Sequence, residues 1–193
     1  AEYRDPHFEF TARDLTFQDR VQKKLAGGVR GALITGVENG GWAALAIDHW
    51  GFGERQEPSE RALVKRLLWQ GDTLWGWRVH DTLAAVDWLR TQPGFEALPV
   101  VTLGLSMGST MALWSAALDT RIAACIDLCC AAEYDALLHS GGFDLHGEYF
   151  FIPGLLCEFT LAEIAALIAP RPHLSLAGRA GPLTPPAGLA SLD

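Results

Sequence analysis

Hydrophobic residues recur along the chain in two patterns, short apolar runs and longer stretches with apolar positions three or four residues apart. The short runs predict buried strands, and they occupy residues 8–12, 41–48, 98–105, 121–130 and 173–178. The spaced pattern predicts amphipathic helices, and it occupies residues 17–36, 61–69, 73–92, 107–118 and 161–169. Because strands alternate with helices, the sequence predicts a three-layer α/β fold: a mostly parallel sheet with a reduced number of strands, covered by helices on both faces.

Two other stretches carry loop residues. Residues 49–60 are rich in glycine and charge and predict a loop. Residues 131–158 contain scattered glycines and no clear period, so we expect an irregular, lid-like region. The helix 73–92 follows Asp72, whose carboxylate is expected to cap it, and stops before Pro93.

Composition narrows the class of protein. The chain has 193 residues, 49% of them hydrophobic, which is enough for one domain over residues 1–193. The net charge of -8 gives no electrostatic reason to bind nucleic acid. The apolar runs are shorter than the ~18 residues of a membrane span, and the polar first ten residues show no signal peptide, so we expect a cytoplasmic protein that binds no membrane. None of the four cysteines has C-x-x-C spacing, which predicts free thiols in the core: Cys125, Cys129, Cys130 and Cys157.

The candidate chemistry centres on the residues Gly-Leu-Ser-Met-Gly at 104–108, between an apolar run and a helix of small residues. A G-x-S-x-G sequence at a strand–turn–helix junction holds its serine in a strained turn, with the hydroxyl above the sheet. Gly104 and Gly108 would let strand and helix approach closely. The backbone N–H of Met107 would donate to an oxyanion at the same place. Ser106 is therefore the candidate nucleophile, and the alternative is a tight turn with an incidental serine.

Four stretches extend this motif into a resemblance: GWAALAIDHWGFGER, VVTLGLSMGSTMALWSAALDTRIAACIDLCC, HGEYFFIPGLL and ALIAPRPHLSLAG. With them the chain resembles the α/β-hydrolases of the dienelactone hydrolase and acetyl xylan esterase-like group. Dienelactone hydrolases proper have cysteine at the motif, so Ser106 points to the esterase-like relatives. The resemblance implies a serine-dependent hydrolase of small or short-chain acyl esters, with no cofactor and no metal.

The sequence departs from the family pattern at both ends. The family's acid lies in a turn after the APRP strand, where this chain has Gly181. The family's histidine comes from a later loop, and its oxyanion loop is an H-G-G-like sequence near the N-terminus; neither is recognised here. The chain therefore looks like a hydrolase core trimmed at both ends.

Other residues are candidates for the missing partners. In the order nucleophile, acid, histidine, the best substitute triad is Ser106, Asp135 and His146, because the last two follow the strand next to the motif. Glu133 is a second candidate acid. The remaining candidates are expected to be structural or solvated: Asp48, His49, Asp127, His139 and His173.

Two functions remain open from the sequence. The first is the ester hydrolase. The second is a degenerate core without catalysis that acts as a binding or self-assembling module. A sheet without its outer strands exposes edges and apolar faces, so a homo-oligomer is expected in addition to the small-molecule ester.

Overall fold

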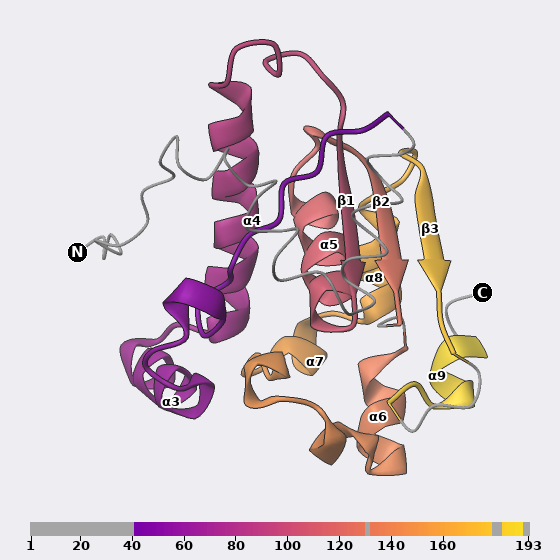
Figure 1. The fold of residues 1–193 in the computed structure, drawn as a ribbon. Coiled ribbons are helices and arrows are strands. Elements are labelled where there is room, and N and C mark those ends of the chain that lie inside the picture. Colours follow the sequence, from indigo (N-terminus) through magenta and orange to yellow (C-terminus); the bar gives the residue numbers. More distant parts are fainter. Residues whose placement is uncertain (1–40, 130–131, 179–182, 191–193) are drawn as a thin grey trace. The chain divides into compact units, whose positions relative to one another are not determined.

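The computed structural model describes residues 41–129, 132–178 and 183–190 (Figure 1). The strand predicted at 8–12, the helix predicted at 17–36 and Gly181 lie outside these residues. The chain divides into two compact units, Ala1–Ile47 and Asp48–Asp193, and every described helix and strand belongs to the second. The single domain expected over residues 1–193 stays a prediction.

A parallel sheet forms the centre of the second unit. Its strands are β1 (Val100–Leu105), β2 (Ile122–Leu128) and β3 (His173–Leu176), in the order β1-β2-β3. Both pairings are parallel, and Figure 1 shows the three arrows pointing the same way. The predicted α/β class and parallel sheet are confirmed, and the carboxyl ends of the strands share one edge.

The strand predicted at residues 41–48 is wrong. These residues form neither helix nor strand, and the Trp42 side chain there is exposed. An apolar run becomes a strand only where another strand offers it hydrogen bonds. None of the three described strands pairs with this run.

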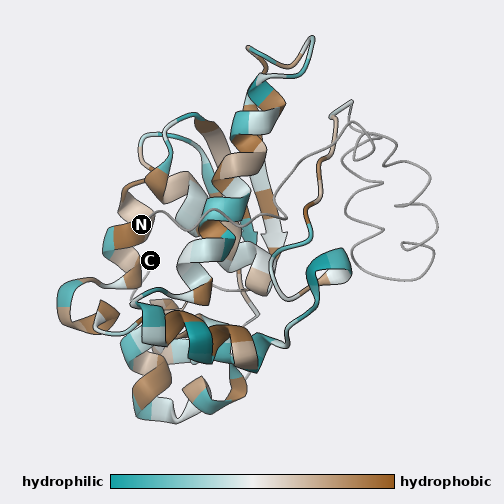
Figure 2. Cartoon of the chain, turned by 90° about the vertical axis from the view of Figure 1, so that its left-hand side faces the viewer, coloured by the Kyte–Doolittle hydropathy of each residue, from teal (hydrophilic) through white to brown (hydrophobic). Residues whose placement is uncertain are grey.

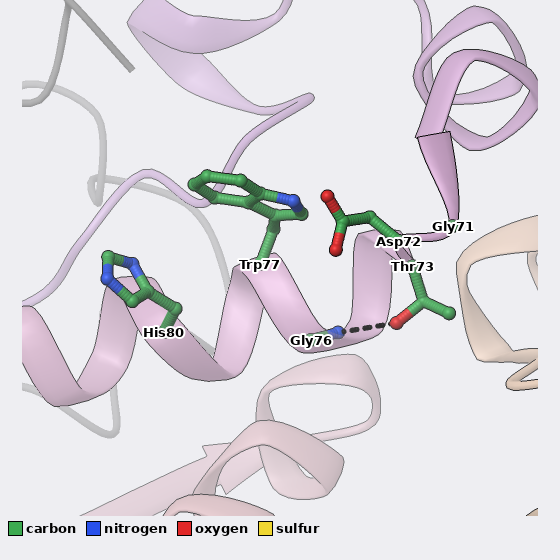
Figure 3. A pocket seen from close by; sticks show the side chains of 6 residues that line it. All are labelled: Gly71, Asp72, Thr73, Gly76, Trp77 and His80. Atoms are coloured by element: carbon green, nitrogen blue, oxygen red, sulfur yellow. Dashed lines mark hydrogen bonds between the residues drawn. The ribbon is translucent and has the colours of Figure 1, made fainter. Parts of the chain in front are cut away.

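Helix α5 (Met107–Leu118) packs on β1 and β2, and two further helices, α4 (Leu74–Arg90) and α8 (Leu161–Ala166), pack on α5. Helix α3 (Glu60–Gln70) contacts α4. Figure 2 shows hydrophobic and hydrophilic residues interleaved along the described helices. The cap of α4 is Thr73 and not Asp72. The Thr73 hydroxyl accepts a hydrogen bond of 3.0 Å from the Gly76 N–H (Figure 3). Asp72 stands one residue too early, and its own N–H donates to the Leu67 carbonyl at 2.9 Å.

Residues 131–158 are not irregular, as the sequence predicted. Their described part carries short helices: α6 (Tyr134–Ser140), η3 (Gly142–Leu145), η4 (Glu148–Phe150) and α7 (Leu155–Glu158). Two glycines with positive φ, Gly141 at 73° and Gly154 at 77°, separate them. Gly141 ends α6, and Gly154 immediately precedes α7, so both glycines lie at helix boundaries. Two further short helices are η2 (Gly53–Arg55) and α9 (Pro186–Ala190).

The core lies between α5 and the helices around it. Trp75 of α4, 1% exposed, is its largest member, and its ring lies 5.1 Å from those of Trp114 and Phe150. On the sheet, the Thr102 hydroxyl donates to the Ala112 carbonyl of α5 at 3.1 Å. Helix α5 therefore covers the face of the sheet that carries Thr102.

The opposite face of the sheet carries apolar side chains that are partly exposed. It carries the leucines that alternate with Thr102 in β1 and with Ser175 in β3, and these are 37–53% exposed: Leu103, Leu105, Leu174 and Leu176.

Candidate functional site

Ser106 occupies the single residue between β1 and α5. Its backbone has φ 56° and ψ -120°, a region that side-chain-bearing residues rarely adopt. Its N–H donates to the Leu128 carbonyl at 2.9 Å, and its carbonyl accepts from the Thr110 N–H at 3.1 Å. Such conformations cost about 1–3 kcal/mol and persist only where the surroundings impose them. The strand, its neighbour and the helix thus hold Ser106 in a strained turn.

The Ser106 side chain is available for chemistry. The residue is exposed at the carboxyl edge of the sheet. Among the described residues, no group forms a hydrogen bond with its hydroxyl. The turn therefore presents an uncommitted hydroxyl to solvent.

The two glycines of the motif differ in their roles. A Cβ at Gly104 would overlap the backbone of Gly108 and Ser109. A Cβ at Gly108 would meet no atom of another described segment within 4 Å. Gly104 is therefore required for the close approach of β1 and α5, as the sequence predicted, whereas Gly108 is not.

Met107 is the first residue of α5. Its N–H has no carbonyl acceptor inside the helix, because the first four N–H groups of any α-helix lack one. The helix dipole adds partial positive charge at this end. Met107 thus offers a donor directly beside Ser106, and its role as an oxyanion donor stays a prediction.

Cys129 is a second strained residue at the same edge, and the sequence did not reveal it. Its φ is 66°, and its N–H donates to the Leu176 carbonyl at 2.7 Å. Leu105 and Leu128 are register partners, so Cys129 lies beside Ser106. The prediction of core thiols holds for Cys125, whose burial raises its thiol pKa to about 11. It is wrong for the exposed Cys129 and Cys157, and Cys130 lies outside the described residues.

His146 follows η3 and is half-buried. Its ring stacks on Phe150 with centroids 4.3 Å apart, and its Nε2 is buried without a hydrogen-bond partner in the described residues. Burial lowers the pKa of His146, and a hydrogen bond with the Leu183 backbone acts in the opposite direction. The imidazole is therefore neutral at pH 7, the protonation state that a general base requires.

Asp135 lies in the first turn of α6, with its carboxylate 3.3 Å from His139 Nδ1; both side chains are exposed. Within residues that the structure describes, no hydrogen bond joins any two of Ser106, Asp135 and His146. The structure brings Asp135 to His139 instead. The catalytic roles of Asp135 and His146 stay predictions.

Glu133, the other candidate acid, is engaged elsewhere. Its carboxylate accepts the N–H groups of Leu161 at 3.0 Å and Ala162 at 2.8 Å, the first two residues of α8. This contact satisfies donors that the helix itself leaves unpaired. Glu133 therefore anchors α8 across a separation of 28 residues.

Asp127, which is buried, pairs with the partly exposed His173 side chain; the sequence treated them as two separate structural residues. Asp127 is completely buried, and its Oδ2 lies 2.5 Å from His173 Nε2. Its Oδ1 accepts from the Ser175 hydroxyl at 2.9 Å, and Ser109 of α5 lies 3.5 Å away. The carboxylate thus joins β2, β3 and α5. The pair depends on the register of β2 against β3, which the sequence alone does not specify.

The loop after residue 47 is structural, as the sequence predicted for Asp48 and His49. The Asp48 carboxylate accepts the Glu54 N–H at 3.1 Å. Asp81 of α4 is 1% exposed and accepts from Arg55 Nη1 at 2.7 Å. Burial raises the pKa of Asp81 and the Arg55 charge lowers it.

Two cavities lie apart from the Ser106 hydroxyl. One, of about 300 Å³, lies at the start of α4 and is lined by Gly71, Asp72, Thr73, Gly76, Trp77 and His80 (Figure 3). The other, of about 730 Å³, includes Glu60, His146 and Glu148 in its lining. Ser106 lines neither of them.

Over the described stretches of the chain, no three side chains gather in a way that would hold a metal ion. No helix in the same stretches is long and apolar enough to cross a membrane.

Comparison with known proteins identifies a relative of the chain. It is 42% identical over 153 residues to the Bacillus subtilis (strain 168) protein named "Putative hydrolase YtaP". The match covers 79% of this chain and 51% of YtaP, so the chain spans about half the length of this relative. No family model matches the sequence.

A solved structure shares the fold. It is a putative acetyl xylan esterase from Bacteroides fragilis NCTC 9343, and it matches with a TM-score of 0.60 and 21% identity. The match covers 71% of this chain and 40% of the esterase chain. At 21% identity it shows that the fold is shared. The resemblance drawn from the sequence is confirmed at this level. The chain has an α/β-hydrolase-like fold and is a homologue of a putative hydrolase.

Proposed function

We propose that this chain is a serine-dependent carboxylic ester hydrolase that acts on small or short-chain acyl esters. One observation carries the proposal: Ser106 is held at positive φ between β1 and α5, with its hydroxyl exposed and uncommitted. The homology to a putative hydrolase supports the reaction class. The acetyl xylan esterase of the same fold makes acetyl esters the first substrates to test.

The mechanism assigns a role to each group at the turn. Ser106 Oγ attacks the acyl carbon and loses its proton to a base, while the Met107 N–H stabilises the oxyanion. The base returns the proton to the leaving alcohol, and water then hydrolyses the acyl-serine. His146 is our candidate base because it is neutral at pH 7. Asp135 is the candidate acid, although its carboxylate lies at His139.

The rate should be modest. No hydrogen bond joins His146 to Ser106 in the described residues, so the hydroxyl is not activated in this arrangement. Oxyanion contacts and binding alone leave about 10³–10⁴-fold catalysis over water in serine hydrolases that lack triad members. We therefore expect turnover of activated esters such as 4-nitrophenyl acetate and little or none of amides.

The test compares wild type with Ser106→Ala on 4-nitrophenyl acetate and on a fluorophosphonate probe. Wild type should release nitrophenol and carry the probe on Ser106, and the variant should do neither. Thr120→Ala is the matched control, because Thr120 carries an exposed hydroxyl just before β2 and lines neither cavity. Full activity in Ser106→Ala would show that Ser106 is not the nucleophile.

A second candidate function, the self-assembling module, has one observation of its own. The exposed leucines of β1 and β3 form an apolar face of the kind that marks interaction sites. Absence of probe labelling in wild type, together with self-association, would favour this function over the esterase.

A further inference from the structure

One buried guanidinium joins the segments around the Ser106 turn. Arg78 of α4 has a completely buried side chain. Its Nε and Nη2 donate to the Trp50 carbonyl at 3.1 and 3.0 Å. Its Nη2 also donates to Glu60 Oε2 of α3 at 2.8 Å. With Nε and Nη2 bonded to the loop at Trp50 and to α3, Nη1 of Arg78 faces a third segment.

That third segment is the start of α5. Arg78 Nη1 lies 3.2 Å from Met107 Sδ, one residue after Ser106. The rings of Phe52 and Tyr149 lie 4.9 and 4.8 Å from the guanidinium carbon, so one aromatic side chain from the loop that carries Trp50 and one from η4 pack on it. The loop at 50–52, α3, α5 and η4 thus meet at this one group.

Such a site demands arginine. A buried charge is costly unless it is paired and hydrogen-bonded, and here Glu60 and the Trp50 carbonyl compensate it. Burial lowers the pKa of Arg78, and Glu60 raises it. The planar fork directs separate N–H groups at three acceptors, which the single ammonium of lysine cannot do in this geometry. Gly51 leaves room for the guanidinium, since a Cβ at this position would lie 3.0 Å from Arg78 Nη2.

We propose that Arg78 is a positioning residue for the reaction at Ser106. Through Met107 it fixes the first turn of α5, and with it the direction of the Met107 N–H toward the oxyanion. The inference rests on the proposed esterase function. The Arg78 side chain itself touches no substrate. Through Arg78, the loop at 50–52 and α3 also help to hold the oxyanion donor in place.

The kinetic test uses two variants and one control. Arg78→Lys keeps the charge but loses the fork, and Met107→Leu keeps the shape but removes the sulfur acceptor. Both should lower kcat on 4-nitrophenyl acetate by about tenfold to a hundredfold, with KM within about twofold, because small misplacement of a catalytic group has effects of this size. Arg121→Lys alters a surface arginine that pairs with Asp119 and Asp87, and it should keep the wild-type kcat.

A second measurement detects the contact between Arg78 and Met107 independently of enzyme activity. The chain has two methionines, Met107 and Met111, so ¹³C-methyl-methionine spectra contain two signals to assign. The Met107 signal should shift in Arg78→Lys, and the Met111 signal should stay. If Arg78→Lys fails to fold, Met107→Leu alone decides the question.

The outcomes separate the two proposals. An inert and unlabelled wild type overturns the esterase function and this inference with it. An active wild type with unchanged kcat in Arg78→Lys and Met107→Leu overturns only the inference. An active wild type with a selective fall in kcat and a shifted Met107 signal supports both.

Discussion

At the scale of single residues, Gly104 sets how closely α5 approaches the sheet. A Cβ there would overlap the backbone of α5, whereas one at Gly108 would meet open space. We expect Gly104→Ala to lower the free energy of unfolding by about 1–3 kcal/mol, the usual effect of overpacking. Gly108→Ala is the matched control, and it should be neutral or stabilising by up to about 1 kcal/mol, because alanine favours helix. Urea denaturation measures both, and equal effects of the two substitutions would contradict the assignment.

The same scale shows which site residues a sequence can reveal. Ser106 could be predicted because its turn depends on five consecutive residues between a strand and a helix. The strain at Cys129, the pairing of Asp127 with His173 and the burial of Arg78 could not, because each depends on register or packing between distant segments. The histidine and acid of the site were inferred from chain order alone, which carries no distance information.

At the scale of elements, Asp127 holds the edge strand β3 in place. Its carboxylate bonds to His173 and Ser175 of that strand and is completely buried. Asp127→Ala should lower the free energy of unfolding by about 3–5 kcal/mol, because the partners of a buried charged group are left unpaired. Ser175→Ala removes one hydrogen bond and should cost about 0.5–1.5 kcal/mol. Urea denaturation measures the free energy of unfolding of both variants. Hydrogen exchange should show the β3 amides less protected in Asp127→Ala than in wild type. Similar losses of unfolding free energy in the two variants would refute the anchoring role.

The elements themselves followed from the sequence where the signals were local. The strands within 98–105, 121–130 and 173–178 lie where apolar runs predicted them. The strand predicted at 41–48 was wrong because a strand needs a hydrogen-bonding partner strand, and the apolar character of a run does not show whether one is present. The cap of α4 was misplaced by one residue, since both Asp72 and Thr73 are good caps and only geometry separates them.

At the scale of the whole molecule, the exposed leucines predict self-association. Leu103 and Leu105 of β1 and Leu174 and Leu176 of β3 lie on the sheet face opposite α5. Parallel sheets are ordinarily buried on both faces, and contiguous exposed apolar surface favours association. We expect a second copy of the chain to cover this face in solution.

Sedimentation velocity over a range of concentrations tests the expectation against the monomer mass of 21.0 kDa. Wild type should sediment as an oligomer, and the double variant Leu174→Gln, Leu176→Gln should shift toward monomer, because two polar amides would be desolvated at the contact. Leu118→Gln is the control: Leu118 is 58% exposed but lies at the end of α5, away from the sheet face. A monomeric wild type at all concentrations, or equal effects of the control and the double variant, would rule out this face as the contact. The result also bears on function, because an oligomer that carries the fluorophosphonate probe combines the two proposed functions in one molecule.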